Sequence, residues 1–430
     1  MAGMSFSLVK LLAILLWVAV WTAPLAAEDW PQWRGPNRTG HVANQARVPV
    51  ALPAHLREVW QIGIGPGLAS PIIAGGKLFY FDNQAGRETI HALNPSDARE
   101  LWRATVDDAF KDEQGPSGPR CTPMVDGDLL YAQSGKGELQ CLGTGDGRLI
   151  WRINFMRDFG AAFLGEDSPV PGAAEHGYTA SPVIVGSRLI ACVGGTNDTG
   201  IVCFDKHNGK LLWKSQRDRA AYAAPVVANL AGVGQVICFT VDGLIGLAQD
   251  NGALLWRVPL KTPYGRNCTT PVVRGDTVVV GSYRAGLVGI KVSAGGTGLK
   301  AERAWLNKTL PMNFSSPVCV GDYLFGLGPA RKLICVEIET GRLAWEKPGY
   351  FSTPAELGYA SFLVMGQNIL VCADDGQASL IAADPAACRE LGRARLCGPN
   401  WCSPAYADGR LYLQDGLKSA GKLYCYQLLP

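Results

Sequence analysis

The chain has 430 residues, of which 47% are hydrophobic and 18% are charged, a balance typical of a globular protein with a substantial core. This composition excludes a disordered chain, and the formal net charge of +3, without any basic run or stripe, argues against nucleic-acid binding. The length alone would suggest two or three domains, but an internal repeat indicates one closed body.

The first 27 residues have the organisation of a secretory signal peptide. Lys10 supplies a positive charge, residues 11–20 form an apolar run, and Ala26 and Ala27 are small residues before the expected cleavage point. The run is too short to cross a bilayer core of about 30 Å comfortably, and no cysteine follows that could carry a lipid. We therefore expect an exported protein, periplasmic or secreted, with no transmembrane span after cleavage. An uncleaved anchor is the alternative, and Leu25, larger than the residue preferred there, leaves the cleavage point open.

Residues 28–57 form a segment rich in proline and glycine that carries two tryptophans, Trp30 and Trp33. Clusters of proline and glycine interrupt regular helices and strands. We interpret the segment as a strap that packs its indole rings on the domain that follows, in preference to a ligand-binding loop.

The rest of the chain, residues 58–430, repeats a short motif in which serine, threonine or alanine usually precedes proline. Most copies are separated by roughly 40–50 residues, the spacing of propeller blades and solenoid repeats. The eight copies are Ala69-Ser70-Pro71, Cys121-Thr122-Pro123, Ala180-Ser181-Pro182, Ala223-Ala224-Pro225, Thr269-Thr270-Pro271, Ser315-Ser316-Pro317, Ala360-Ser361-Phe362 and Cys402-Ser403-Pro404. They predict an all-β fold, an eight-bladed β-propeller with four antiparallel strands in each blade.

The third unit illustrates how one blade is encoded. Pro182 stands at the start of the innermost strand, where its missing N–H does least harm to the sheet. Gly209 supplies a turn that needs a positive φ, just before the outer strand. The predicted strands are 183–185, 188–193, 201–205 and an outer strand that ends in Trp213.

A tryptophan recurs in the outer strand of most units, where its large apolar face is expected to pack against the next blade. The recurring residues are Trp102, Trp151, Trp213, Trp256, Trp305 and Trp345. The seventh unit has Leu391 and Gly392 at this place, so we expect a less regular blade there. The eighth unit ends after three strands, and residues 58–62 supply the missing outer strand. We therefore expect an N-terminal strand to join the last blade and close the ring.

The thirteen cysteines are an odd number for an exported protein. Several occupy one repeat position, where cysteine serves as a small buried apolar residue; they are Cys141, Cys203, Cys335 and Cys425. Cys192 with Cys203, and Cys397 with Cys402, flank turns and could form disulfides. We favour free, buried thiols over a disulfide framework, and no zinc-type spacing occurs.

These units resemble the pyrroloquinoline-quinone-type propeller repeat, in which an apolar residue and an aspartate precede a threonine–glycine turn and a tryptophan. The residues that carry the resemblance are Leu142, Thr144, Gly145 and Trp151; Phe204, Asp205, Gly209 and Trp213; and Val336, Thr340, Gly341 and Trp345. The resemblance covers about residues 58–427. It implies one of two branches: quinone-dependent alcohol dehydrogenases, or non-enzymatic propellers similar to the outer-membrane-protein assembly factor BamB, which bind other proteins.

The enzymatic branch implies a Ca²⁺ ion held by oxygen ligands, a catalytic aspartate and a disulfide between adjacent cysteines beside pyrroloquinoline quinone (PQQ). No adjacent cysteine pair occurs in the sequence. Glu166, Asp167 and Glu175 are acidic candidates in a long insert, but no ligand-like set recurs, and the histidines at 41, 55, 91, 176 and 207 form no visible cluster. We assign no catalytic, cofactor-binding or metal-binding residue. A PQQ- and Ca²⁺-dependent alcohol dehydrogenase, or a degenerate relative, stays as the alternative.

The loops that enter the innermost strands crowd one mouth of the channel, so a binding site is expected just before each motif. An aromatic and amide-lined funnel there suits a protein segment, a peptide or a sugar, unless the loops only cap the channel with water. The candidate residues are Arg120, Tyr178, Tyr222, Arg266, Asn267, Asn313, Tyr359 and Trp401. We therefore expect an exported, monomeric, non-enzymatic propeller that binds protein partners in the cell envelope, and the resemblance to BamB implies a link to outer-membrane protein assembly.

Overall fold

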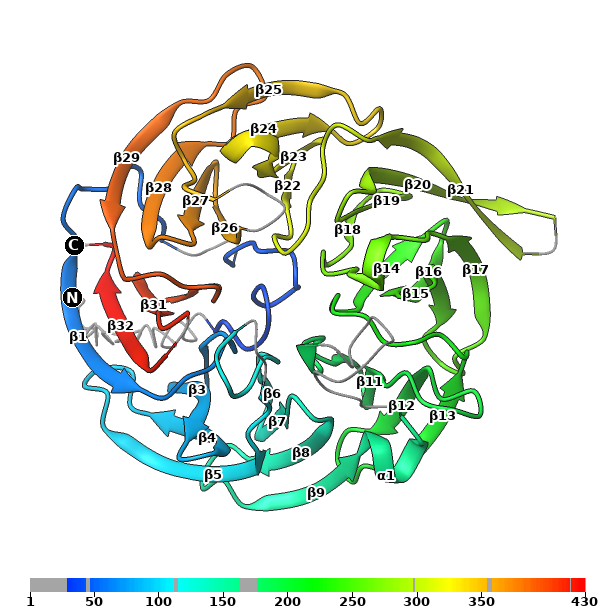
Figure 1. Ribbon diagram of the computed structural model, residues 1–430, viewed down its shortest axis with the longest axis horizontal. Helices are drawn as coiled ribbons and strands as arrows, with labels where there is room; N and C mark the ends of the chain where they lie inside the picture. Colours follow the sequence, from blue (N-terminus) through cyan, green and yellow to red (C-terminus); the bar gives the residue numbers. More distant parts are fainter. Residues whose placement is uncertain are drawn as a thin grey trace, which may run out of the picture.

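The computed structural model describes residues 29–43, 47–111, 115–161, 176–296, 298–353, 358–417 and 419–429. They form a closed ring of eight four-stranded antiparallel sheets around a central channel (Figure 1). The predicted all-β, eight-bladed propeller is confirmed. The predicted signal peptide lies outside the described residues, and so do Glu166, Asp167 and Glu175. No helix in the described part of the chain is long and apolar enough to cross a membrane.

Each blade begins with a strand at the channel and ends with an outer strand on the circumference (Figure 1). Blade 1 comprises β2 (Ile72–Ala74), β3 (Lys77–Gln84), β4 (Arg87–Leu93) and β5 (Glu100–Asp108). Blade 2 comprises β6 (Met124–Asp126), β7 (Leu129–Gln133), β8 (Glu138–Gly143) and β9 (Leu149–Asn154). Blade 3 comprises β10 (Val183–Val185), β11 (Arg188–Cys192), β12 (Ile201–Asp205) and β13 (Leu211–Ser215). Blade 4 comprises β14 (Val226–Leu230), β15 (Val233–Thr240), β16 (Gly243–Ala248) and β17 (Leu254–Pro259).

The second half of the ring follows the same order. Blade 5 comprises β18 (Val272–Arg274), β19 (Thr277–Ser282), β20 (Gly286–Gly295) and β21 (Gly298–Asn307). Blade 6 comprises β22 (Val318–Val320), β23 (Tyr323–Gly328), β24 (Lys332–Glu337) and β25 (Leu343–Lys347). Blade 7 comprises β26 (Ala360–Met365), β27 (Asn368–Ala373), β28 (Gln377–Ala382) and β29 (Glu390–Arg395). Blade 8 comprises β30 (Ala405–Ala407), β31 (Arg410–Gln414), β32 (Gly421–Gln427) and β1 (Arg57–Ile64); the short helices are α1 (Phe155–Phe159), η2 (Pro263–Gly265) and η3 (Pro329–Arg331).

In blade 3 the first and third predicted strands agree with β10 and β12, and the second is one residue shorter than predicted. The predicted end of the outer strand at Trp213 is wrong, because β13 continues to Ser215. Trp213 lies in mid-strand because it pairs with Cys203, next to a β-bulge between Cys203 and Phe204. The bulge re-aims the outer strand and turns the indole toward the adjoining blade.

Tryptophans of the outer strands connect several blades to the next. The Trp151 indole lies over the turn of blade 3, where a Cβ on Gly209 would come within 2.9 Å of its ring, and its Nε1 donates to the Lys206 carbonyl oxygen at 2.9 Å. Gly209 has a φ of +71°, so glycine satisfies both the turn and the close approach. Three further indoles stack in the same way, in the pairs Trp102–Gly147, Trp213–Gly252 and Trp305–Gly341. The expected packing between blades is confirmed for these four tryptophans.

The ring closes as predicted, since β1 pairs antiparallel with β32 and places Trp60 opposite Cys425. The seventh blade, however, is not irregular: it keeps four strands and the bulge between β28 and β29. At the place of the missing tryptophan, Leu52 of the N-terminal segment forms a bridge with Gly392, and its backbone N–H donates to the Leu391 carbonyl oxygen at 3.0 Å. A Cβ on Gly392 would come within 1.9 Å of the Leu52 oxygen, so this glycine admits the N-terminal segment.

Hydroxyl groups of the repeated motif connect the innermost strands to one another. The Ser70 backbone N–H donates to Thr122 Oγ1 at 3.1 Å, and the Ser403 N–H donates to Ser70 Oγ at 2.9 Å. These contacts join blade 8 to blade 1 and blade 1 to blade 2. The hydroxyl of the motif is therefore part of the scaffold around the channel.

The N-terminal strap crosses the central channel, where the dark-blue trace lies in Figure 1. Trp30 is buried and forms a bridge with Ile73 of blade 1, so this indole packs on the propeller as expected. Further along, the Val42 backbone N–H donates to the Val364 carbonyl oxygen of blade 7 at 3.0 Å. The strap thus contacts the two blades that flank blade 8, which the sequence did not indicate.

Ten of the thirteen cysteines are buried free thiols. Cys192 lies opposite Ile201 and Cys203 lies opposite Ile190, so the first suggested pair does not face each other across the hairpin. Burial raises the pKa of Cys203 to about 12, as expected of a thiol used as an apolar side chain.

We predict that Trp151→Ala weakens the contact between blades 2 and 3. Its indole is 8% exposed, so truncation removes a buried ring and a hydrogen bond, and the free energy of unfolding should fall by about 3–5 kcal/mol. Urea denaturation followed by circular dichroism measures the change. Leu149→Ala is the matched control, because Leu149 lies on the same strand but is 43% exposed, and it should cost no more than about 0.5 kcal/mol. Equal destabilisation by both variants would contradict the proposed role of the indole.

Candidate binding cavity at the channel mouth

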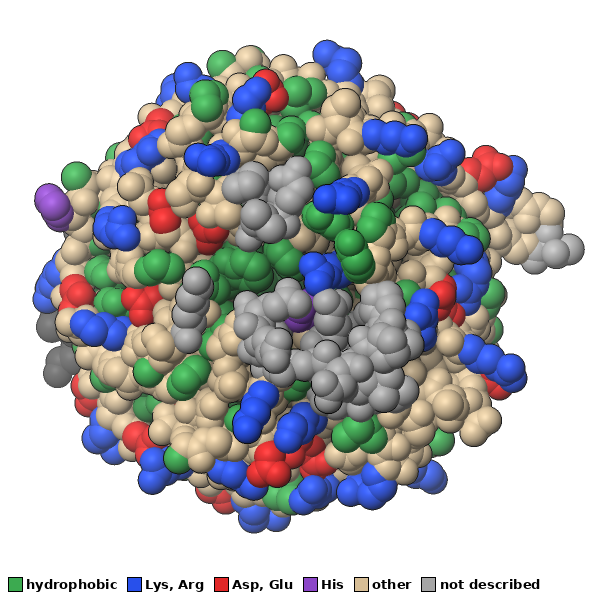
Figure 2. All heavy atoms as spheres, in the orientation of Figure 1, with side chains coloured by type: hydrophobic (Ala, Val, Ile, Leu, Met, Phe, Trp, Pro, Cys, Tyr) green, Lys and Arg blue, Asp and Glu red, His purple; other side chains and the backbone are tan. Residues whose placement is uncertain are grey.

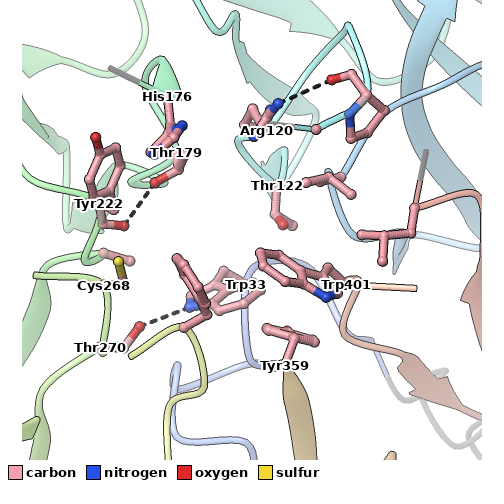
Figure 3. Close-up of a pocket in the computed structure, with 16 residues that line it drawn as sticks. Trp33, Arg120, Thr122, His176, Thr179, Tyr222, Cys268, Thr270, Tyr359 and Trp401 are labelled. Atoms are coloured by element: carbon pink, nitrogen blue, oxygen red, sulfur yellow. Dashed lines mark hydrogen bonds between the residues drawn. The ribbon is translucent and has the colours of Figure 1, made fainter. Parts of the chain in front are cut away.

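A cavity of about 390 Å³ opens at one mouth of the channel, where the loops that precede the innermost strands converge (Figure 3). Figure 2 shows hydrophobic side chains gathered in the hollow at the centre of this face. The lining residues are Trp33, Leu68, Gly115, Pro116, Arg120, Thr122, His176, Thr179, Tyr222, Ala224, Cys268, Thr270, Phe314, Tyr359, Trp401 and Leu417. We refer to this hollow as the mouth cavity.

Every blade contributes the same repeat position to the wall of the mouth cavity. This position stands three residues before the proline of each motif, or before Phe362 in blade 7. In blade order it is occupied by Leu68, Arg120, Thr179, Tyr222, Cys268, Phe314, Tyr359 and Trp401. Side chains alternate in direction along a chain that enters a strand, so the residues directly before the prolines, such as Thr122 and Thr270, face the same cavity.

The structure brings four of the eight predicted funnel residues to the mouth cavity, namely Arg120, Tyr222, Tyr359 and Trp401. The other four, which are Tyr178, Arg266, Asn267 and Asn313, do not line it. Three of these stand four residues before the proline, so the alternation turns them away. The Tyr178 hydroxyl donates to the Val193 carbonyl oxygen at 2.9 Å, and Asn267 Nδ2 donates to the Thr240 carbonyl oxygen at 2.7 Å. These side chains hold the loops in place.

Several residues of the wall were not among the predicted funnel residues. Trp33 comes from the strap and contributes to the cavity from below, with its Nε1 donating to Thr270 Oγ1 at 3.0 Å (Figure 3). Nothing in the composition of the strap indicates that this indole enters the channel. Phe314 and Cys268 could have been found, because they occupy the same repeat position as Trp401.

Aromatic side chains form one side of the mouth cavity. The rings of Phe314 and Trp401 are 4.8 Å apart, and Tyr359 stacks on Trp401 at 6.1 Å with an angle of 26° between the ring planes. The Tyr359 hydroxyl is fixed by a 2.8 Å hydrogen bond with Ser403 Oγ, and burial raises the pKa of this phenol, which keeps it neutral. The result is a preorganised surface on which another apolar or aromatic group can stack.

The opposite side is more polar. Arg120 NH2 donates to the Pro116 carbonyl oxygen at 3.1 Å, and Thr179 Oγ1 donates to the Tyr222 carbonyl oxygen at 3.0 Å (Figure 3). Among the described residues that line the cavity there is no aspartate or glutamate. The arrangement offers stacking surfaces, hydroxyl groups and a guanidinium group.

A model of the family described as outer membrane protein assembly factor BamB matches residues 86–347, more than half of the chain. The chain belongs to this family. BamB of Burkholderia pseudomallei is 24% identical over 292 residues, which are 63% of this chain and 64% of that protein. BamB of Shewanella oneidensis is 26% identical over 275 residues, or 61% of this chain and 65% of that protein. The chain thus aligns with just under two thirds of these BamB relatives.

Solved structures support the fold alone. The crystal structure of BamB from Moraxella catarrhalis superposes with a TM-score of 0.57 at 17% identity, covering 87% of this chain and 98% of that one. The quinohemoprotein alcohol dehydrogenase ADHIIG from Pseudomonas putida HK5 superposes with a TM-score of 0.63 at 11% identity, covering 93% and 80%. Both branches suggested by the repeat therefore share this architecture.

The described residues of this BamB-family chain do not fit the quinone and calcium pair of the dehydrogenases. Calcium takes six to eight oxygen ligands, among which carboxylates are prominent, and the described lining of the mouth cavity contains no carboxylate. Elsewhere in the described residues, no group of three or more histidine, cysteine, aspartate or glutamate side chains could hold a metal ion. We derive no catalytic step from this cavity.

Glu88 is a buried carboxylate behind the polar side of the mouth cavity, where it holds the loop that contacts Arg120. It accepts hydrogen bonds from the backbone N–H groups of Phe110 at 3.0 Å and Gly135 at 3.1 Å, and the Phe110 ring lies 5.5 Å from the Arg120 guanidinium. Burial is the main cause that raises the pKa of Glu88 from 4.5 to about 7, although the two N–H groups lower it. Its proton is thus held more tightly in the folded state than in the unfolded state.

We predict that Glu88 makes the protein less stable as the pH rises. Its contribution is fully present below pH 4.5 and is lost as the pH passes about 7, a change of about 3 kcal/mol. Glu88→Gln should remove most of this decline in the free energy of unfolding, measured by urea denaturation at pH 5 to 8. Asp108→Asn is the matched control, since this nearby carboxylate is 64% exposed, and it should leave the pH profile unchanged. A wild-type slope retained in Glu88→Gln would contradict the assignment.

Proposed function

We propose that the chain is an exported, non-enzymatic propeller that binds a segment of another protein in the mouth cavity. The observation that supports this most is the wall itself, in which one repeat position supplies three adjoining aromatic rings, Phe314, Tyr359 and Trp401, facing a guanidinium from Arg120. Rigid aromatic surfaces with a few oriented polar groups are typical of sites that bind peptides and protein segments.

The size of the mouth cavity favours a few side chains rather than a whole domain. A volume of about 390 Å³ lies at the lower end of the range of about 300–1,000 Å³ for ligand sites. The strap lies beneath it, so a bound segment would enter and leave by the same mouth. Membership of the BamB family supports a scaffold role in outer-membrane protein assembly, and we propose that the chain acts there as a monomer in the periplasm.

A photo-reactive phenylalanine analogue at position 401 tests this proposal. Because the analogue replaces Trp401 in the wall, irradiation of cells should yield a covalent adduct with an envelope protein. The matched control is position 264, where Tyr264 is 57% exposed and does not line the mouth cavity. For the partner so identified, Trp401→Ala should weaken binding to the purified chain at least tenfold, whereas Tyr264→Ala should not. Equal adducts at both positions, or unchanged binding by Trp401→Ala, would refute the proposal.

The alternative is the quinone-dependent dehydrogenase, which the shared architecture keeps open. Titrating the purified protein with PQQ and Ca²⁺ distinguishes the two functions. We expect neither a saturable quinone absorbance band nor dye-linked oxidation of alcohols, because the described cavity lining lacks carboxylate ligands. A saturable band accompanied by alcohol oxidation would establish the enzyme and overturn the binding proposal.

A further inference from the structure

A second cavity, of about 520 Å³, lies on the other side of the strap from the mouth cavity. We call it the strap cavity. Its wall includes Val227 of β14, Arg274 of β18 and the strap from Arg34 to Ala43. Trp33 borders the mouth cavity whereas Arg34 borders the strap cavity, so the strap separates the two spaces.

The strap cavity combines positive charge with apolar walls. Arg34, Arg38 and Arg274 line it together with His41, and its described lining contains no aspartate or glutamate. Arg274 is paired with Asp322, whose Oδ1 accepts from its Nε at 3.0 Å, so the charge without a counter-ion comes from Arg34 and Arg38. Valines of β14 and β18 form much of the remaining wall. A space of this kind favours a ligand that has an anionic group and an apolar body.

The guanidinium of Arg38 is fully used within the protein. It is 4% exposed, and NH1 donates to the Ser181 carbonyl oxygen at 3.0 Å while Nε donates to Gln32 Oε1 at 2.9 Å. A second terminal nitrogen donates to the carbonyl oxygen of Pro182. Arg38 therefore supplies charge behind the cavity without offering a free donor.

Arg34, in contrast, has an unused donor. It is 7% exposed, and its NH2 donates to the carbonyl oxygens of Thr39 at 3.2 Å and Pro317 at 2.6 Å. Its Nε has no hydrogen-bond partner among the described residues but is sealed off, whereas NH1 is not sealed off and forms no hydrogen bond with a described residue. Nor does either guanidinium, Arg34 or Arg38, contact a carboxylate in the described part of the chain.

Two buried guanidinium groups without a counter-charge are costly, because neither carbonyl oxygens nor apolar walls neutralise them. An anion beside Arg34 would accept the N–H groups of NH1 and offset both charges. We propose that the strap cavity binds the carboxylate of an apolar chain, with Arg34 as its buried donor and the valines in contact with the apolar body. The carboxylate could belong to the C-terminus of a polypeptide or to a fatty acid. This site does not depend on the function proposed for the mouth cavity.

Isothermal titration of the full exported chain tests the proposal with three defined probes: octanoate, N-acetyl-Val-Val with a free carboxylate, and the same dipeptide as a C-terminal amide. At least one acid should bind saturably, and its affinity should fall as salt is added. The amide should bind at least tenfold more weakly than the peptide acid. Binding of the peptide acid alone identifies a polypeptide C-terminus, and binding of octanoate alone identifies a fatty acid. No saturable binding of either acid at millimolar concentration, or equal binding of acid and amide, would overturn the proposal.

Two variants locate the site. Arg34→Met removes the donor, and Val227→Glu adds a negative charge to the wall without changing the strap; each should weaken binding of the acid at least tenfold. Val233→Glu is the matched control, because Val227 is 40% exposed and Val233 is 38% exposed in the same blade, but Val233 does not line the cavity. Thermal unfolding shows which variants are folded. If Arg34→Met does not fold, Val227→Glu still tests the site. Unchanged binding in folded Val227→Glu would refute the site, whereas Trp401→Ala should leave it intact.

Discussion

The hydrogen bonds between the strap and the carbonyl groups that line the channel organise this propeller. Proline at the start of most innermost strands has no N–H, so the inner edge of the ring presents carbonyl acceptors without matching donors. The strap supplies those donors: Arg38 contacts the carbonyl oxygens of Pro182 and Pro225, and Arg34 contacts that of Pro317. The motif prolines thus provide the acceptors, and the strap arginines provide the donors, of the same set of hydrogen bonds.

This interaction also divides the channel into two chemically different spaces. On one side of the strap, Trp33 meets the aromatic wall of the mouth cavity; on the other, the guanidinium groups and valines form the strap cavity. Burial lowers the pKa of both Arg34 and Arg38 to about 10, which leaves them charged at neutral pH. The two buried strap guanidinium groups thus lie on the side away from the aromatic wall, and each side suits a different class of ligand.

The fold could be predicted almost completely from the sequence, because it depends on local patterns that are repeated eight times. Strand length, turn glycines and the outer tryptophans each act within one blade or between neighbours, so β10 and β12 were predicted to the residue. The strap could not be placed, because its contacts span the ring; Arg38 bonds to residues about 140–190 positions away in the chain. Likewise, the bridge between Leu52 and Gly392 of blade 7 joins residues 340 positions apart and could not be predicted from the repeat spacing.

The mouth cavity was predicted in place but only partly in composition, and the reason is the alternation of side chains. The predicted residues were aromatic, amide or arginine side chains near each motif, whereas the wall is formed mainly by one repeat position. Neighbouring residues therefore differ: Thr179 lines the cavity and Tyr178 does not. Positions that pack blades together repeat the same residue types, such as the outer tryptophans and the motif hydroxyls. The wall position instead holds leucine, arginine, threonine, cysteine and four aromatic residues. Since blade packing does not require this variety, and since three of the rings come from adjoining blades 6, 7 and 8, the wall is asymmetric in a way that favours one orientation of a bound segment.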